Sequence, residues 1–275
     1  MNYIAYHFQI EPKEEFTDML LAELSLFDFE TFEETEQGLS AYIQEELDEE
    51  DLVSQLNLLQ NKEVSISYKR EKVETINWNK EWEKNFSPIE VGSTCRVRAP
   101  FHEKKEVEFD IVIEPKMSFG TGHHATTYQM IQLILEEDWH SKKVLDMGCG
   151  TGVLGILSSM KGAKEVTYID IDDWCVENTE ENLIRNQVKG KVILGGAEKI
   201  NANFDVIIAN INRNILLNDL ATYSAHLNEN GQIYLSGFYK EDLPIIRDEA
   251  SKQGLTFVKN VEKDNWIAAK FMKLC

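Results

Sequence analysis

A glycine-rich loop is the strongest chemical signal in this sequence. A predicted strand over residues 143–147 runs directly into Gly148, Gly150 and Gly152. Glycines let a backbone approach a ligand where a Cβ would intrude. Asp170 ends the next predicted strand, 22 residues after Gly148. A carboxylate at that place can accept hydrogen bonds from the two hydroxyls of a ribose, so loop and acid together predict a nucleoside site.

The spacing of the glycines indicates which nucleoside binds. A dinucleotide fingerprint, G-x-G-x-x-G, needs its third small residue at position 153, where this chain has Val153. The pattern G-x-G-x-G preceded by Asp146 instead resembles the class I S-adenosylmethionine methyltransferases. A purely structural glycine turn in a doubly wound domain is the alternative, because short motifs give false positives.

Two further polar residues follow predicted strands. Asn210 ends the predicted strand 204–210, beside the crevice where open α/β sheets bind ligands. Glu198 follows the strand 191–194, where the methyltransferase fold usually presents a polar or acidic residue near the adenine. A solvated loop position is an equally good interpretation of Glu198.

The loop before the glycine motif carries two adjacent histidines, His123 and His124. Neighbouring side chains point in different directions and no third ligand follows at a suitable spacing, so we predict no metal site. We expect instead that the loop closes over a cofactor, with Gly120 and Gly122 as hinges. Phe119 would then cover the methionine end, unless it packs in the core.

The motifs fall in an order that resembles one family. Phe-Gly-Thr-Gly with His and Thr-Thr, then Asp-x-Gly-Cys-Gly-x-Gly, Ile-Asp-Ile-Asp and Ala-Asn-Ile are similar to the bacterial methyltransferases of ribosomal large-subunit protein eleven. The likeness covers residues 95–275, includes residues 77–86 and extends to the N-terminal segment. It implies a ferredoxin-like domain that recognises the substrate, a linker, and a Rossmann-like domain that transfers methyl groups from S-adenosyl-L-methionine to lysine or N-terminal amines of that basic ribosomal protein.

The resemblance also implies site residues. The family's cofactor contacts fall on Thr127, Gly148, Asp170 and Asn210, and Asn210 is also the catalytic candidate. Gly150, Phe119 and Glu198 complete the predicted cofactor-binding set. Many amine- and amide-modifying relatives carry Pro-Pro-Tyr after this Asn or Asp, whereas here Ile-Asn-Arg follows. The aromatic wall that clamps a planar amide or adenine is then missing, which favours a flexible aliphatic amine.

Methyl transfer depends mainly on aligning a neutral amine with the methyl group, and no residue stands out as a dedicated base. An α-amino group, with its ordinary pKa near 7.7–8.0, loses its proton more easily than a lysine near 10.4.

The chain is long enough for two domains, with 275 residues. The first 70 residues show a βαββαβ pattern, in which a second helix starts at Asp48, and we expect a ferredoxin-like α+β domain. Residues 71–93 are predicted to form a linker with a short helix that carries Trp78 and Trp82 on one face. From residue 94 to 275 strands and helices alternate and two strands close the chain. This predicts a doubly wound, mostly parallel seven-stranded sheet with an antiparallel edge hairpin.

Charge is concentrated at the N-terminus. The net charge is −20, and residues 1–60 hold 16 acidic side chains against Lys13 alone, a net of −15. The remaining residues carry 27 basic and 32 acidic side chains, a net of −5. A phosphate backbone is bound by Lys and Arg, so no direct nucleic-acid dependence is expected and a basic protein partner is favoured.

No apolar run or leader indicates a membrane, and four scattered cysteines indicate a reducing compartment, so we expect a cytoplasmic protein. We also expect a monomer. Three other functions stay open. They are a methyltransferase of the same fold acting on RNA or a small molecule, a cofactor-binding protein without catalysis, and, least favoured because of Val153, a dehydrogenase.

Overall fold

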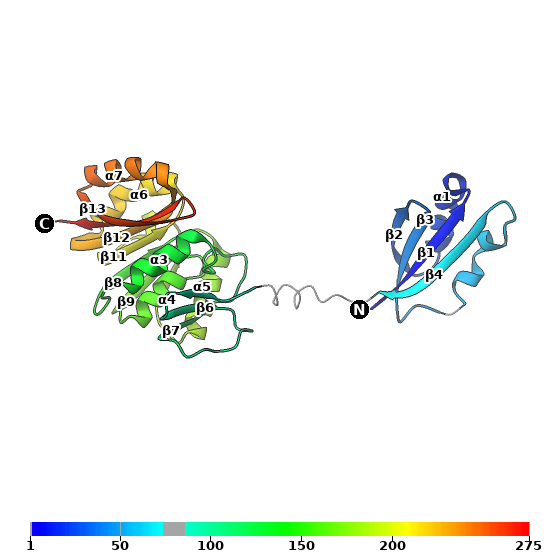
Figure 1. Ribbon diagram of the computed structural model, residues 1–275, viewed down its shortest axis with the longest axis horizontal. Coiled ribbons are helices and arrows are strands. Elements are labelled where there is room, and N and C mark those ends of the chain that lie inside the picture. The colour runs from blue at the N-terminus through cyan, green and yellow to red at the C-terminus, as the bar shows by residue number, and fades with distance from the viewer. Residues whose placement is uncertain (1, 50, 74–85, 275) are drawn as a thin grey trace. The chain divides into compact units, whose positions relative to one another are not determined.

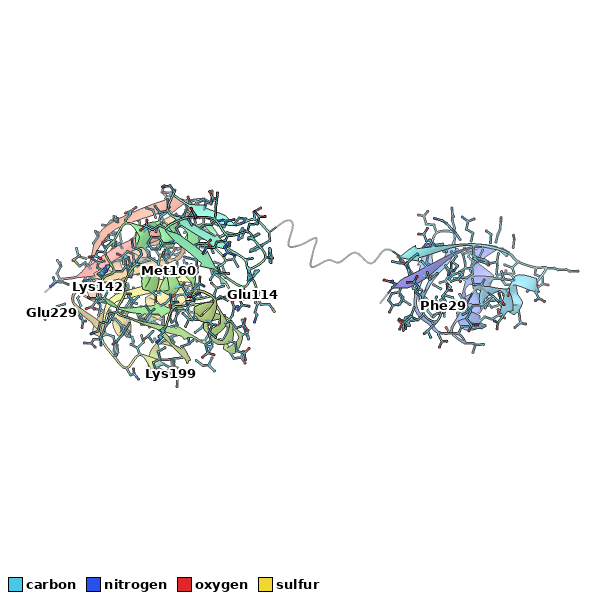
Figure 2. The ribbon with its side chains drawn as sticks, turned by 90° about the horizontal axis from the view of Figure 1, so that it is seen from below. Phe29, Glu114, Lys142, Met160, Lys199 and Glu229 are labelled. Atoms are coloured by element: carbon cyan, nitrogen blue, oxygen red, sulfur yellow. The ribbon has the colours of Figure 1, made fainter. Side chains whose placement is uncertain are left out.

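The computed structural model describes residues 2–49, 51–73 and 86–274, and the chain divides into two compact units, residues 1–85 and 86–275 (Figure 1). Figure 2 shows the side chains of both units, with Phe29 marking the smaller one. No helix in the described ranges is long and apolar enough to cross a membrane.

The smaller unit is a four-stranded antiparallel sheet in the order β2-β3-β1-β4. Alternate residues of β1 are buried, from Ile4 to Ile10, and they pack against Leu20 and Leu24 of α1. This strand order is that of a ferredoxin-like fold. Its elements are β1 (Tyr3–Glu11), α1 (Lys13–Leu24), β2 (Phe29–Thr35), β3 (Gly38–Gln44), the 3₁₀ turns η1 (Val53–Gln55) and η2 (Asn57–Gln60), and β4 (Ser65–Val73).

The second α-helix predicted from Asp48 onward is wrong, because η1 and η2 occupy that stretch. Leu56 is extended between them, with φ −71° and ψ 122°. The break turns Leu58 into the core, where it is 5% exposed, and its N–H donates to the Glu23 carboxylate at 3.0 Å. A single helical face could not bury Leu52, Leu56 and Leu58 together.

The predicted linker, 71–93, is strand at both ends. β4 continues to Val73 and β5 begins at Ile89. The short helix with Trp78 and Trp82 lies outside the described residues.

The larger unit is built on a seven-stranded sheet in the order β10-β9-β8-β11-β12-β14-β13. β14 runs antiparallel to both β12 and β13, so the two closing strands form the predicted edge hairpin. The strands are β8 (Lys143–Met147), β9 (Glu165–Asp170), β10 (Lys191–Leu194), β11 (Phe204–Asn210), β12 (Leu227–Tyr239), β13 (Leu255–Lys263) and β14 (Trp266–Lys273).

Two hydrophobic clusters cover the two faces of this sheet. One face packs against α3, α4 and α5, and the other against α6 and α7 (Figure 1). The helices are α3 (Ala125–Leu135), α4 (Val153–Met160), α5 (Asp173–Arg185), α6 (Arg213–Ala225) and α7 (Leu243–Lys252), with 3₁₀ turns η3 (Ala197–Lys199) and η4 (Lys240–Asp242). A small sheet of β5 (Ile89–Val91), β6 (Cys95–Arg98) and β7 (Phe109–Val112) precedes them.

Candidate functional site

Three adjacent strands end together at one edge of the large sheet. β9, β8 and β11 are neighbours and run parallel, so their carboxyl ends meet. Asp170 ends β9, Gly148 follows β8 and Asn210 ends β11. The strand order reverses between β8 and β11, which is where open α/β sheets bind ligands. The fold thus gathers the residues that the sequence placed far apart.

The glycine loop has a backbone that other residues rarely adopt. Gly148 and Gly150 have φ values of 65° and 56°. A Cβ on Gly150 would lie 2.2 Å from the carbonyl oxygen of Phe119, and one on Gly148 would lie 2.2 Å from the side chain of Ile211. Both positions therefore require glycine, for conformation and for space.

Asp146 supports this loop from inside the protein. Its Oδ2 accepts the N–H of Gly155 in α4 at 2.8 Å, and the side chain is 1% exposed. Burial raises the pKa of Asp146 to about 7, and the nearby Asp170 adds to the rise against the opposing hydrogen bond from Gly155. Asp146 is therefore a structural residue beneath the loop.

Asp170 is held in place by the loops on both sides. Its Oδ2 accepts the N–H of Gly150 at 2.8 Å and its Oδ1 accepts the N–H of Asp172 at 3.2 Å. The carboxylate is 7% exposed. Each oxygen keeps acceptor capacity, which fits the two hydroxyls of a ribose.

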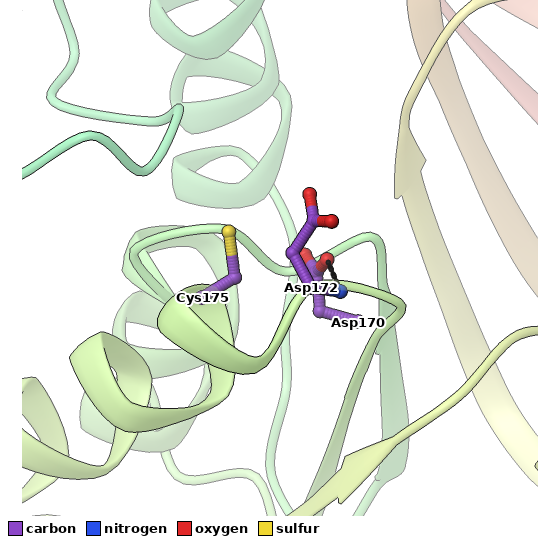
Figure 3. A group of neighbouring side chains, drawn as sticks. All are labelled: Asp170, Asp172 and Cys175. Atoms are coloured by element: carbon purple, nitrogen blue, oxygen red, sulfur yellow. Dashed lines mark hydrogen bonds between the residues drawn. The ribbon is translucent and has the colours of Figure 1, made fainter.

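Asp170, Asp172 and Cys175 offer ligand atoms within 4.8 Å of one another (Figure 3). Burial raises the pKa of the Cys175 thiol, and the protonated thiol is a poor metal ligand. Asp170 is already engaged by two backbone N–H groups. We therefore interpret this group as part of the nucleoside site.

Asn210 and Thr127 meet at the end of β11. The Nδ2 of Asn210 donates to the Thr127 hydroxyl at 3.4 Å, and Thr127 is 1% exposed in the first turn of α3. The Oδ1 of Asn210 is buried and has no partner among the residues that the structure describes. A buried acceptor without a donor is costly, so this oxygen fits a ligand that brings an N–H or a positive charge.

The loop before α3 is anchored on the glycine loop. The carbonyl of Phe119 accepts the N–H of Thr151 at 2.9 Å, and the Thr151 hydroxyl donates to the carbonyl of Gly120 at 2.8 Å. An open pocket of about 460 Å³ is lined by residues 117–121, His123 and His124. The side chain of Phe119 is 53% exposed, so the alternative that it packs in the core is wrong. Closure of this loop over a cofactor stays a prediction.

The two histidines are held by separate contacts. His123 has Nε2 at 2.9 Å from the carbonyl oxygen of Ser87. His124 caps α3, where its Nδ1 accepts the N–H of Thr126 at 3.3 Å. Each ring thus has a local structural role.

An aromatic row was missed by the sequence reasoning. The His124 ring lies 5.2 Å from that of Phe119 and 4.8 Å from that of Trp266, and Trp266 lies 4.0 Å from Tyr239, all between centroids. The absent Pro-Pro-Tyr motif indicated no aromatic wall, but rings come here from the loop before α3 and from the ends of β12 and β14. Only the sheet topology, with β14 inserted beside β12, could have indicated this.

Glu198 lies on η3, exposed to solvent. Its Oε1 accepts the N–H of Gly196 at 3.0 Å, and this bond lowers the pKa of Glu198. Two exposed apolar residues stand nearby in the fold, Ile171 after β9 (65% exposed) and Leu194 at the end of β10 (51%). Apolar side chains at these strand ends offer a surface for a flat ring, a feature that the sequence reasoning had not singled out.

Residues 9–273 match the family model described as Ribosomal protein L11 methyltransferase (PrmA). The chain belongs to this family. It is 46% identical over 279 residues to a Ribosomal protein L11 methyltransferase of Phocaeicola vulgatus, with 99% of each chain covered, and 46% identical to one of Bacteroides fragilis, with 99% of this chain and 100% of the relative covered.

A solved structure supports the fold. The ribosomal protein L11 methylase of Lactobacillus delbrueckii subsp. bulgaricus has a TM-score of 0.65 and 26% identity, covering 69% of this chain and all of that one. The family and the α/β methyltransferase fold predicted from the sequence are therefore confirmed.

Proposed function

We propose that this protein transfers methyl groups from S-adenosyl-L-methionine to amines of ribosomal protein L11. The name shared by its family and its relatives supports this substrate. The observation that carries the reaction type is the buried Oδ1 of Asn210 at the end of β11, which has no hydrogen-bond partner within the described ranges of the chain. A bound S-adenosyl-L-methionine supplies an electrophilic methyl group on a sulfonium.

Asn210 is the residue that we place at the reacting atoms. Its Nδ2 is committed to Thr127, which leaves Oδ1 to accept an N–H from the target amine. An amine that donates to this oxygen has its lone pair fixed in direction, and alignment supplies much of the rate in such a displacement. Thr127 sets the direction of the amide and acts as a positioning residue.

The cofactor side is assigned to Asp170 and the glycine loop. The Asp170 carboxylate would accept hydrogen bonds from the ribose hydroxyls, while Gly148 and Gly150 let the loop backbone come close to the cofactor. Phe119 and Glu198 belong to the same proposed set, at the methionine and adenine ends respectively. The space that a Cβ would fill at Gly148 and Gly150 fits a cofactor that lies close to the loop backbone.

The amine side is assigned to the aromatic row of Phe119, His124, Trp266 and Tyr239. Aromatic faces attract alkylammonium groups through their negative quadrupole. Such a surface can guide an aliphatic chain toward Asn210, because His124 caps the helix that also carries Thr127. This row suits a flexible amine. The sequence reasoning favoured the same kind of substrate, but it did so from the absence of an aromatic wall, and rings are present here.

The smaller unit is proposed to recruit the basic substrate. Residues 1–73 carry 18 acidic and 5 basic side chains, a net of −13. Four of these cations are already paired within the unit, Lys13 with Glu34, Lys69 with Glu71, Arg70 with Asp48 and Lys72 with Glu45. The remaining carboxylates give a negative field that attracts a basic protein.

Labelled S-adenosyl-L-methionine, incubated with isolated ribosomal proteins and the enzyme, tests the proposal. We expect label on protein L11, with mass analysis placing it on amines. Asn210→Ala should lower turnover more than it weakens cofactor binding, because its oxygen acts on the amine. An Asn210→Ala enzyme with normal turnover would place the reacting centre elsewhere.

The same assay separates the other candidates. Label on ribosomal RNA or on small molecules would favour a different substrate class, and cofactor binding without any transfer would indicate a protein that has lost catalysis. We expect a cytoplasmic monomer that meets its substrate without RNA, which ribonuclease treatment and a sedimentation measurement will check.

A further inference from the structure

A fully buried glutamine holds the backbone of Trp266. Gln129 of α3 is 0% exposed, and its Nε2 donates to the Trp266 carbonyl oxygen at 2.9 Å. The Oε1 of the same amide is buried without a partner in the described part of the chain. Burying an amide with one end unpaired costs free energy that an apolar side chain of the same size would not. Packing alone therefore does not explain a glutamine at this position.

A second buried hydrogen bond fixes the next residue of the same strand. The Ser236 side chain of β12 is 0% exposed, and its Oγ donates to the Ile267 carbonyl oxygen at 2.7 Å. Ser236 also lies opposite Asn210 in the register of β11 and β12. The first two residues of β14 are thus each held by a buried polar side chain, at the edge of the sheet where Asn210 lies.

One helix connects these contacts to the rest of the site. The first turns of α3 begin with His124, whose ring packs on Trp266, and continue with Thr127, which accepts from Asn210. Gln129 follows two residues later and holds the Trp266 backbone. A shift of Trp266 relative to α3 would change the ring contact with His124 while leaving Asn210 and Thr127 in place.

We propose that Gln129 is a positioning residue for the amine side of the site. Its hydrogen bond sets where the Trp266 indole stands against His124, and so governs how the protein substrate binds without acting on the cofactor. The inference rests on the proposed function, in which the aromatic row receives the target amine. Ring contacts are directional, so a displaced indole presents a different surface to that amine.

Gln129→Met in the full chain tests this directly, because methionine matches the length of glutamine but cannot donate. We expect kcat/KM for the ribosomal protein to fall roughly 10- to 100-fold, mostly through KM, with the Kd for S-adenosyl-L-methionine changed by less than about twofold. In a Trp266→Ala background the same substitution should have no further effect, since the ring that it positions is gone. If the fold-losses in kcat/KM of Gln129→Met and Trp266→Ala multiply in the double variant, the two residues act independently and the proposal is overturned. A loss of cofactor affinity as large as the loss of kcat/KM would also overturn it.

Ser224→Ala is the matched control. Ser224 also donates from a buried side chain to a distant carbonyl, that of Gln253, but at the C-terminal end of α6. The Ser224→Ala variant should lose as much stability as Gln129→Met but keep the wild-type KM for the ribosomal protein. If Ser224→Ala also weakens binding of the ribosomal protein, the effect of Gln129→Met is explained by lost stability alone, and the assignment of Gln129 is overturned.

A fluorine spectrum separates failure of this inference from failure of the proposed function. The chain has five tryptophans, so fluorotryptophan labelling gives five resonances, and Trp266→Phe assigns that of Trp266. The Trp266 resonance should move in Gln129→Met and stay in place in Ser224→Ala, whatever the enzyme methylates. An unmoved Trp266 resonance in Gln129→Met would overturn the positioning role even if the protein methylates L11.

Discussion

The carboxylate of Asp170 accepts a hydrogen bond from the backbone N–H of Gly150, with 2.8 Å between Oδ2 and N. The acid at the end of β9 thus also orders the glycine loop that follows β8. One side chain serves both halves of the proposed nucleoside site, which links ligand affinity to loop geometry.

Asp170→Ala is therefore expected to weaken S-adenosyl-L-methionine binding by about 1.5–3 kcal/mol, the range for losing a hydrogen bond to a charged group. Isothermal calorimetry measures the change. Asp205→Ala is the control, because Asp205 similarly accepts the N–H of Lys143 at 2.8 Å, from β11 to the neighbouring β8. Both variants should lose stability, but Asp205→Ala should bind cofactor normally. Unchanged affinity in Asp170→Ala would remove Asp170 from the cofactor site.

Gly150→Ala should disrupt the contact between the glycine loop and the loop before α3. The new Cβ would lie 2.2 Å from the Phe119 carbonyl oxygen, so one loop must move. We expect cofactor affinity to fall at least about tenfold, with a stability loss above the ~1–2 kcal/mol of a left-handed alanine. Calorimetry and urea unfolding provide the two measurements.

Gly92→Ala measures by itself the cost in stability of placing an alanine at a positive φ. Gly92 has a similar φ of 62°, but apart from its two neighbours in the chain no atom of the described residues lies within 4 Å of an added Cβ. It should show the conformational cost alone and bind cofactor normally. Equal effects of the two substitutions would mean that the contact with Phe119 is unimportant.

Much of the site was predictable because it depends on short-range patterns. The strand, glycine turn and helix around Gly148 follow from local sequence, as does Asp170 at a strand end. The aromatic row was not predictable, since Trp266 reaches His124 only through the insertion of β14 beside β12, which is a tertiary event. The helix expected from Asp48 failed for a related reason, because burial of Leu58 outweighed a helical spacing of leucines.

Asp146 predicts a pH dependence of stability. Its folded pKa, about 7, lies above its ordinary value of 3.8, so the folded state binds this proton more tightly than the unfolded state. The favourable contribution is complete below pH 3.8 and is lost as pH rises through 7. The free energy of unfolding should fall by up to about 1.4 kcal/mol per pH unit on approaching pH 7.

Asp146→Asn should flatten this dependence, because an amide oxygen can still accept the N–H of Gly155 but does not titrate. Urea unfolding from pH 5.5 to 8 measures the difference between the two proteins. Asp205→Asn is the control and should leave this slope in place. Desolvation is the largest single influence on the pKa of Asp205 and raises it, but hydrogen bonds from Lys143 and Asn228 and the nearby lysine charges together outweigh it, so the pKa is lowered. Parallel curves for the wild type and Asp146→Asn would show that Asp146 does not titrate in this range.

The negative charge of the smaller unit can be reduced without altering its packing. Three exposed carboxylates lie in the connections that follow β2 and β3, and none belongs to a hydrogen bond or ion pair that we identify among the described residues. They are Glu36, Glu46 and Glu49. Exchanging each for glutamine raises the net charge by three and preserves side-chain shape.

The glutamine variant is expected to raise KM for the ribosomal protein several-fold and to leave cofactor affinity unchanged, because steering acts on the association of a basic partner. Wild-type KM should itself rise with salt, as the Debye length shortens from roughly 10 Å at 0.1 M toward 3 Å at 1 M, and the variant should respond less steeply. A control with the same charge change in the larger unit combines Glu180→Gln, Glu229→Gln and Asp248→Asn. Steady-state kinetics across a salt series compares all three proteins. If both triple variants raise KM equally, the net charge of the protein matters and its location in the smaller unit does not. If KM does not change with salt, the proposal of electrostatic recruitment is wrong.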